Sequence, residues 1–208
     1  VPMSRLQAMV NLPDGTTTDE VARALTNHTA TVEKVEVVGG ELTGPIVIGH
    51  ILSSVPEPQK NGKIINWCRV DVGPRYNAEG HPKNIAEGTE GRGIICGAPN
   101  AVEGAWVVVS LPGAVLPGGF AISARKTYGH MSDGMLCAAD ELGIGVYEPG
   151  IITLPPSVEG HQLVPGENAL PILGVPEQVL DVDVTPDIGY CMSMRGIARE
   201  VAHAMSVH

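Results

Sequence analysis

Aromatic residues are scarce in this chain of 208 residues, at 3%: two tryptophans, one phenylalanine and four tyrosines. Charged residues, at 17%, are too few for a disordered chain, whereas apolar residues, at 43%, suffice for a core. The four cysteines form no CxxC pair, which excludes an obvious zinc site or disulfide framework. Neither a signal peptide nor an apolar run of transmembrane length is present, so we expect a cytoplasmic protein without membrane contact.

Glycine and proline are abundant instead, with 26 and 17 residues, about a fifth of the chain. Such a content indicates many short turns and favours a β-rich architecture over long helices.

The net charge of −10 is unevenly distributed. Residues 60–133 hold eight Lys/Arg and six Asp/Glu, and the remainder holds five Lys/Arg and seventeen Asp/Glu. The centre is therefore mildly basic, at +2, against −12 elsewhere. This balance argues against a protein that coats nucleic acid indiscriminately.

The two ends of the sequence show helices and strands with recognisable start signals. Thr17 and Glu20 form a capping box for a helix that runs to about His28, and Ser193 can cap a C-terminal helix. The elements predicted here are helices over Met3–Val10, Thr17–His28 and from Ser193 onward, and strands over Val32–Val38 and Val179–Val184.

The central part of the sequence has a pattern that is typical of a small β-barrel. Five short extended runs are predicted, over Ile46–Val55, Ile65–Val72, Ile94–Cys96, Trp106–Leu111 and Ala121–Thr127. A short helix is predicted over Asp133–Leu142, with Ser132 or Asp133 as its N-cap and Gly143 as its stop. About five strands and one helix suit a Greek-key barrel of the OB type.

The predicted fold class is therefore α+β, an OB-type five-stranded barrel inserted into a small discontinuous α/β domain. Residues 1–39 and 152–190 would form the two parts of the outer domain, 40–151 the barrel, and 191–208 a separate helix.

Several blocks resemble the N-terminal part of the beta subunit of bacterial phenylalanyl-tRNA synthetases. They follow one another in the family's order across nearly the full chain, which makes the combination far more specific than any one block. They are VPMS through VNLP at 1–13, CRVDVG at 68–73, ICGAPN at 95–100, LPGAVLPGG at 111–119, SDGMLCAADELGIG at 132–145 and DVTPDIGYCMSMRGIAREVA at 183–202.

The resemblance implies a tRNA-binding barrel within an ATP-dependent ligase whose alpha subunit supplies the aminoacylation site. It implies no catalytic or metal-binding residue and no cofactor in this segment, since ATP and magnesium belong to the complete enzyme. The helix 191–208 would lead toward an editing domain beyond it. The sequence departs from the family at 57–63 and in an apparent insertion at 74–92.

Eight residues are candidates for tRNA contact, since OB barrels combine cations with stacking aromatics. Trp67 would stack, and the resemblance places Ser132 and Met135 near RNA. The cations are Lys60, Lys63, Arg69, Arg125 and Lys126. The alternative is that the cations are solvated surface groups, that Trp67 packs against the neighbouring domain, and that Ser132 and Met135 serve capping and core packing.

Three patterns could indicate catalytic or phosphate-binding sites, but a structural role explains each of them better. Cys137 with His130 lacks a third group, so a buried cysteine is favoured. Residues 88–93 lack the Lys-Ser/Thr of a phosphate loop, and Asp181 with Asp183 suit a solvated strand face. The rival function is a free-standing RNA-binding or assembly module, which would need only the barrel.

Overall fold

The computed structural model describes residues 1–86 and 91–207, which group into two compact units. Unit 1 comprises residues 1–40 and 176–208, and unit 2 comprises 41–175. The chain thus leaves unit 1 and returns to it, as an inserted domain requires. The sequence pattern predicts 152–175 as part of the outer domain and 191–208 as a separate helix, whereas the structure groups 152–175 with the barrel and 191–207 with unit 1.

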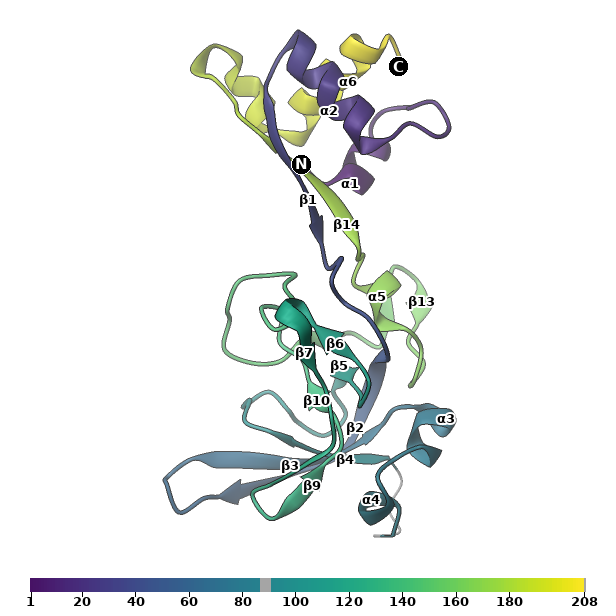
Figure 1. The fold of residues 1–208 in the computed structure, drawn as a ribbon, viewed down its shortest axis with the longest axis vertical. Helices are drawn as coiled ribbons and strands as arrows, with labels where there is room; N and C mark the ends of the chain where they lie inside the picture. The colour runs from purple at the N-terminus through teal and green to yellow at the C-terminus, as the bar shows by residue number, and fades with distance from the viewer. Residues whose placement is uncertain (87–90, 208) are drawn as a thin grey trace. The chain divides into compact units, whose positions relative to one another are not determined.

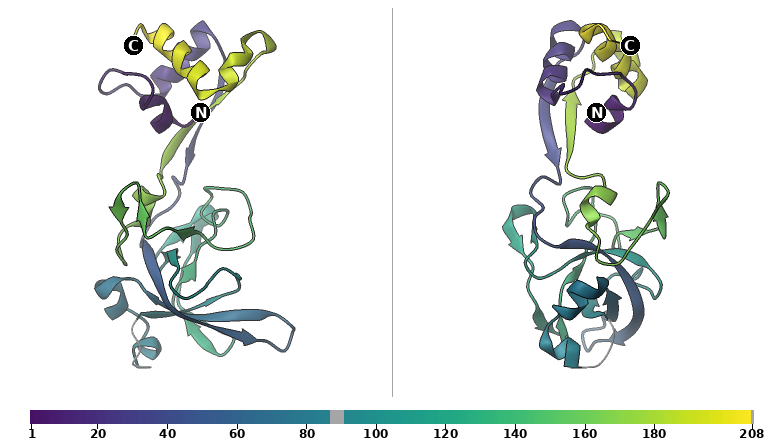
Figure 2. Two further views of the ribbon diagram at one scale, coloured as in Figure 1. Left: turned by 180° about the vertical axis from the view of Figure 1, so that it is seen from behind. Right: turned by 90° about the vertical axis from the view of Figure 1, so that its right-hand side faces the viewer.

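Unit 1 pairs the two ends of the chain through an antiparallel ribbon. Strand β1 (Val32–Val38) pairs with β14 (Glu177–Val182), and both views in Figure 2 show them side by side. The helical elements of this unit are α1 (Met3–Gln7), α2 (Thr18–His28), the 3₁₀ segment η2 (Pro186–Met192) and α6 (Met194–Met205).

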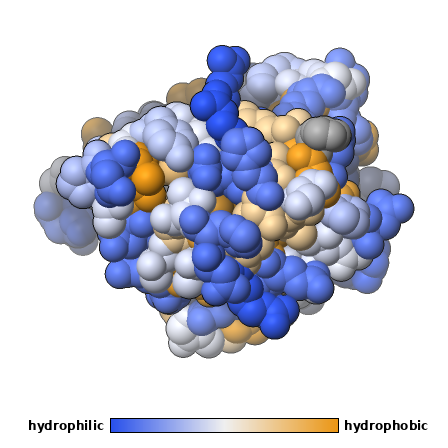
Figure 3. Space-filling model, turned by 90° about the horizontal axis from the view of Figure 1, so that it is seen from above, coloured by the Kyte–Doolittle hydropathy of each residue, from blue (hydrophilic) through white to orange (hydrophobic). Residues whose placement is uncertain are grey.

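Local signals set where the longer helices of unit 1 begin. The predicted capping box of α2 is present, with Thr17 and Glu20 bonding reciprocally. The Ser193 hydroxyl accepts the Gly196 N–H at 3.0 Å and caps α6. The helices then bury apolar stripes in one core with β14, formed by Leu6, Val21, Leu25, Leu180, Ile197 and Val201. The face in Figure 3 is mostly hydrophilic, with an apolar patch within it.

Unit 2 is built on five antiparallel strands that nearly close into a barrel (Figure 1). They are β2 (Ile46–Pro58), β3 (Ile64–Asp71), β4 (Arg92–Cys96), β5 (Trp106–Ser110) and β10 (Met135–Leu136). Their order is β10-β5-β2-β3-β4, with the short β11 (Thr153–Leu154) added on β5. At the closure, the Asp133 N–H donates to the Gly93 carbonyl at 2.9 Å. This arrangement confirms the predicted OB-type barrel. Its fifth strand is β10, however, and not the predicted run Ala121–Thr127, whose two ends belong to two separate hairpins.

The long strand β2 holds the barrel together because it has two partners. Its first half pairs with β5 and its second half with β3, with a register shift between Ile51 and Ser53. Such a bulge bends a strand, which lets one strand serve two sheet directions. Gly49 lies where a Cβ would come within 2.6 Å of Val109 and 2.8 Å of Val70, so the interior tolerates no side chain there.

Unit 2 also contains shorter helices and strands outside the barrel sheet. They are α3 (Gly73–Ala78), α4 (Pro82–Ala86), β6 (Val115–Leu116), the 3₁₀ turn η1 (Pro117–Gly119), β7 (Phe120–Ala121), β8 (Arg125–Thr127), β9 (His130–Ser132), β12 (Ser157–Val158), β13 (His161–Gln162) and α5 (Ala169–Ile172).

The helix predicted over Asp133–Leu142 is wrong. Met135 and Leu136 pair as β10 with Ser110 and Val109 of β5, and the Cys137 N–H donates to the Val108 carbonyl at 2.9 Å. Sheet hydrogen bonds thus satisfy the backbone that a helix would have used. The turns after Cys137 are held by the Glu141 carboxylate, which accepts the Ala138 N–H at 2.8 Å.

Among residues 1–86 and 91–207, no helix has both the length and the apolar character needed to cross a lipid bilayer.

Candidate nucleic-acid interface

The eight candidate residues differ sharply in exposure. Four cations are exposed: Lys60, Lys63, Arg125 and Lys126. Trp67 and Met135 are partly buried, whereas Arg69 and Ser132 are buried. Only the four exposed cations can contact a phosphate directly. The four partly or fully buried residues can only support them.

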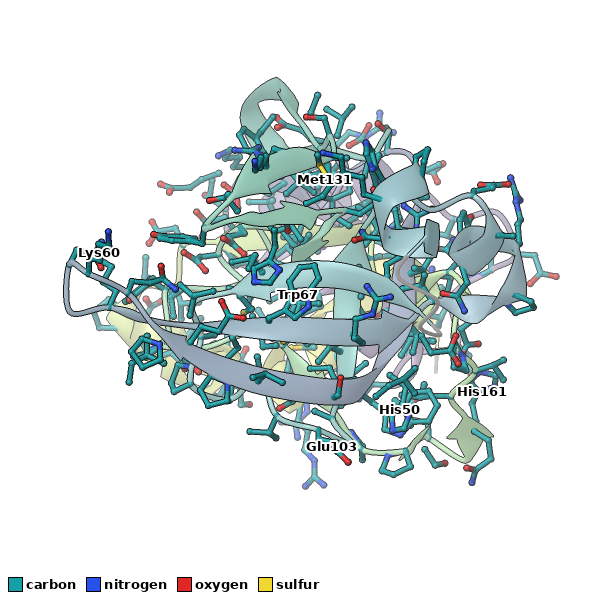
Figure 4. All side chains as sticks on the ribbon, turned by 90° about the horizontal axis from the view of Figure 1, so that it is seen from below. His50, Lys60, Trp67, Glu103, Met131 and His161 are labelled. Atoms are coloured by element: carbon teal, nitrogen blue, oxygen red, sulfur yellow. The ribbon has the colours of Figure 1, made fainter. Side chains whose placement is uncertain are left out.

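Two of the exposed cations lie at the end of the β2–β3 hairpin. Its turn is closed by the Gln59 N–H, which donates to the Lys63 carbonyl at 2.7 Å, and by the Gly62 N–H, which donates to the Gln59 carbonyl at 2.9 Å. Figure 4 shows Lys60 at the tip of this hairpin, with Trp67 farther along the sheet. The two lysines therefore project into solvent where the strands leave the barrel.

The other two cations lie on the β8–β9 hairpin, between β5 and β10 in the chain. Its register pairs Arg125 with Ser132, Lys126 with Met131 and Thr127 with His130. Residues directly opposite on an antiparallel pair share a face, so Lys126 and Met131 lie on one face, and Arg125, Thr127, His130 and Ser132 lie on the other. Ser132 on the second face is buried, whereas Arg125 at the end of the same strand pair is exposed.

His130 ties the two hairpins together. Its Nε2 lies 3.0 and 3.1 Å from the two carboxylate oxygens of Glu57 on β2. Its ring also stacks on Trp67 of β3, with centroids 4.2 Å apart and planes at 17°. Residues 58–64 and 125–132 therefore form one continuous feature, which we call the two-hairpin surface. An OB barrel binds oligonucleotides with the face of its strands 2 and 3, together with the loop between strands 1 and 2 and the loop between strands 4 and 5.

The indole of Trp67 is already in contact with protein. His130 stacks on one face, and a Cβ at Gly93 would come within 2.2 Å of the ring, so β4 requires a glycine there. A base cannot stack on the face that His130 covers. Trp67 therefore packs against residues of unit 2, whereas the alternative interpretation placed its packing partners in the neighbouring domain.

Arg69, Ser132 and Met135 also have structural partners. The Arg69 guanidinium donates to the Asn84 carbonyl at 3.3 Å. The Ser132 hydroxyl accepts the Ile95 N–H at 3.0 Å and donates to the Gly134 carbonyl at 3.2 Å, and Met135 pairs with Ser110. These contacts close the barrel under the two-hairpin surface.

A buried ion pair stabilises the same region. Arg92 Nη1 lies 3.3 Å from Asp133 Oδ2, with both side chains at least 95% buried. Arg92 Nε donates to the Tyr76 carbonyl, and Asp133 accepts the His81 N–H at 2.6 Å. Burial lowers the pKa of Arg92, and the Asp133 carboxylate opposes that effect. Asp133 thus anchors three segments and is not the helix cap that the sequence suggested.

The segment 120–128 carries two exposed aromatic residues that were not among the eight candidates. Phe120 is 47% exposed and Tyr128 43% exposed. Gly129 lies between two short extended runs and is a turn signal, although Tyr128 before it is not a residue that two-residue hairpin turns favour.

The cysteine pattern has the structural role that was expected. Cys137 is fully buried, and burial raises the pKa of its thiol to about 12. Its sulfur lies 2.9 Å from the Ser110 hydroxyl, while His130 is engaged with Glu57 and Trp67. In the described part of the chain, no group of three or more His, Cys, Asp or Glu side chains is arranged for a metal. Of the glycine-rich stretch 88–93, residues 88–90 lie outside that part.

Comparison with descriptions of known protein families found none that matches. Individual relatives are close, however, and all three cited here are phenylalanine–tRNA ligase beta subunits. The protein of Cutibacterium acnes is 94% identical over 208 residues, which is 100% of this chain and 25% of that protein. The proteins of Thermobifida fusca and Bifidobacterium longum are 52% and 45% identical, over 100% and 96% of this chain and 23% of each relative.

The chain is homologous to the N-terminal part of the bacterial phenylalanine–tRNA ligase beta subunit, and it spans about a quarter of the length of these relatives. The resemblance found in the sequence is thereby confirmed. The similarity covers unit 1 as well as the barrel, which a free-standing barrel module would not require.

Proposed function

We propose that this chain is the tRNA-handling N-terminal region of a phenylalanine–tRNA ligase beta subunit and that it holds tRNA weakly through the two-hairpin surface. The observation that carries the proposal is the placement of Lys60, Lys63, Arg125 and Lys126. All four are exposed on two hairpins that the contacts of His130 with Glu57 and Trp67 link.

Phosphate contacts of this kind position a nucleic acid without reading its sequence. Lys and Arg side chains on mobile stems adapt to a backbone, whereas the supporting layer beneath them is packed and hydrogen-bonded. The acidic remainder of the chain, at −12, repels RNA elsewhere and restricts contact to the basic centre. The region would therefore act by positioning tRNA, with bond-making left to other parts of the enzyme.

In the complete enzyme, the partner would be an alpha subunit that carries the ATP- and magnesium-dependent aminoacylation site. This chain would add no cofactor. A cytoplasmic location suits protein synthesis, and it also suits the four free, buried cysteines, since disulfides are rare in reducing compartments.

Charge reversal on the two-hairpin surface tests the proposal. Lys60, Lys63, Arg125 and Lys126 are changed together to Glu, and tRNA binding is measured by fluorescence anisotropy at low salt. A control variant carries Glu at four exposed cations elsewhere: Arg5, Arg23, Lys83 and Arg195. Both variants change the net charge equally.

We expect the surface variant to lose affinity for all tRNAs by a similar factor, while the control keeps most of it. Equal losses in the two variants would mean that only total charge matters. No loss in either would reassign the hairpins to contacts between subunits.

A further inference from the structure

The tip of the β8–β9 hairpin carries an exposed aromatic ring beside the proposed phosphate contacts. Tyr128 is 43% exposed and follows directly after Arg125, Lys126 and Thr127. A strand rises about 3.3 Å per residue, so the Cα of Tyr128 lies at most about 10 Å from that of Arg125 along the hairpin. A few consecutive nucleotides can span that distance. In the described residues, the Tyr128 side chain makes no hydrogen bond or ring contact.

The backbone at this tip is unusual for a tyrosine. Thr127 and His130 are paired, so Tyr128 and Gly129 form a two-residue turn, and their φ angles are 48° and 86°. A two-residue hairpin turn with positive φ at both positions favours Asn, Asp or Gly, because a β-carbon is strained in that conformation. Tyrosine therefore occupies a position where a smaller polar residue would stabilise the fold better.

Packing does not account for the choice of tyrosine. Trp67 stacks on His130 and lies close to Gly93, and Tyr76 packs against the barrel core. Tyr128 in contrast leaves much of its ring in water. A second exposed ring, Phe120, has the Arg125 guanidinium 5.8 Å from its centroid, which places a cation and a planar surface together on the same segment.

We infer that Tyr128 stacks on an unpaired base of an RNA strand whose phosphates Arg125 and Lys126 hold. The inference rests on the proposed function and adds the kind of RNA that the surface takes. Bases in a duplex are covered by their neighbours above and below, whereas bases in loops, bulges and ends offer a free face to an aromatic side chain. The ligand is therefore a single-stranded or looped segment, bound with little sequence preference because every base has such a face.

The test uses the 208-residue chain and two fluorescent probes, a 12-nucleotide single-stranded RNA of mixed sequence and a 12-base-pair RNA duplex. Three variants are compared: Tyr128→Asn, Tyr128→Phe and Tyr147→Asn. Tyr147 is 77% exposed in another loop of unit 2 and serves as the matched control. Thermal melting of each variant checks the fold.

We expect Tyr128→Asn to weaken single-strand binding about 5- to 100-fold, the range that stacking of one base provides. Its melting temperature should be no lower than that of the wild type, since Asn suits the turn. Tyr128→Phe should bind within about two-fold of wild type, because the ring is retained. Tyr147→Asn should bind normally, and duplex binding should be the same in all variants.

The outcomes separate the two proposals. If Tyr128→Asn binds single strands as the wild type does, while the fourfold charge reversal still abolishes binding, the stacking inference is overturned and the proposed function stands. Equal losses for single strand and duplex also overturn it. If the wild-type chain binds neither tRNA nor single-stranded RNA, both proposals fail.

Discussion

Asp133 is the residue whose removal should damage the barrel most. Its carboxylate pairs with Arg92 and accepts the His81 N–H, and both charged side chains are almost wholly buried. A buried charge that loses its partner is strongly destabilising, because neither water nor protein then solvates it.

We therefore expect Asp133→Ala to lower the free energy of unfolding by about 3–5 kcal/mol. Urea unfolding followed by circular dichroism measures this change, with the exposed Asp140→Ala as the control. A loss below about 1 kcal/mol, the value of an exposed pair, would show that the ion pair is not a principal support.

Cys137 offers a second test at this scale, because a catalytic thiol would have to ionise. Burial raises its pKa to about 12, so the thiolate is scarce at neutral pH. We expect a thiol reagent at pH 7 to leave Cys137 unmodified in the folded chain and to react after unfolding. Mass spectrometry locates the modified cysteine, and rapid labelling of Cys137 in the native state would revive the nucleophile interpretation.

At single positions, the sequence predicted the types of side chain at the candidate site better than it predicted how exposed each side chain is. Alternation along Ile65–Val72 places Cys68 and Val70 on one face and Trp67 and Arg69 on the other, and the structure packs the first pair into the core. The alternation could not show that His130 and Asn84 contact the second pair, since these partners come from distant segments. Lys60 and Lys63 are exposed because they lie at the turn between β2 and β3, a local property.

Helices and strands were also predicted correctly where local interactions determine them, and wrongly where a distant segment supplies the hydrogen-bond partners. The start of α2 was predictable because Thr17 and Glu20 satisfy each other within one turn. The segment Asp133–Leu142 has equally good helix signals, yet it forms β10, because β5 offers hydrogen-bond partners that no local pattern encodes. The OB-type fold was inferable from the number of short strands and turns, but its fifth strand was assigned to Ala121–Thr127 in place of β10.

The helices of unit 1 should depend on the returning part of the chain. Short helices are marginal in water without a packing partner, and β1 finds its only strand partner within the described residues in β14. A peptide of residues 1–40 should therefore show little helix by circular dichroism.

Adding a peptide of residues 176–208 should restore helical signal in proportion to its concentration. The separate 41–175 piece should fold alone, since it has its own core. Stable helix in the isolated 1–40 peptide would contradict the discontinuous-domain account.

At the scale of the whole chain, this segment is about a quarter of its relatives' length. We expect the purified chain to charge no tRNA with phenylalanine in the presence of ATP and magnesium. Acid-precipitable radiolabelled phenylalanine measures the activity, with a complete ligase as the positive control. Turnover above the no-protein background would require a catalytic centre within these residues.

The number of exposed cations limits how strongly the affinity for tRNA can depend on salt. Four exposed cations on the two-hairpin surface can neutralise only a handful of phosphates, because Arg69 and Arg92 are buried and already have partners. Few contacts release few counterions, so the affinity for tRNA should depend only modestly on salt.

The most direct measurement is the affinity for tRNA across a salt series, for the wild type and for the fourfold Glu variant at Lys60, Lys63, Arg125 and Lys126. We predict a wild-type slope of log affinity against log salt of about −2 to −4. In the variant, the slope should be flatter by about one unit for each lost contact. Superimposable wild-type and variant curves would contradict the account, because the two hairpins would then make no contact with RNA.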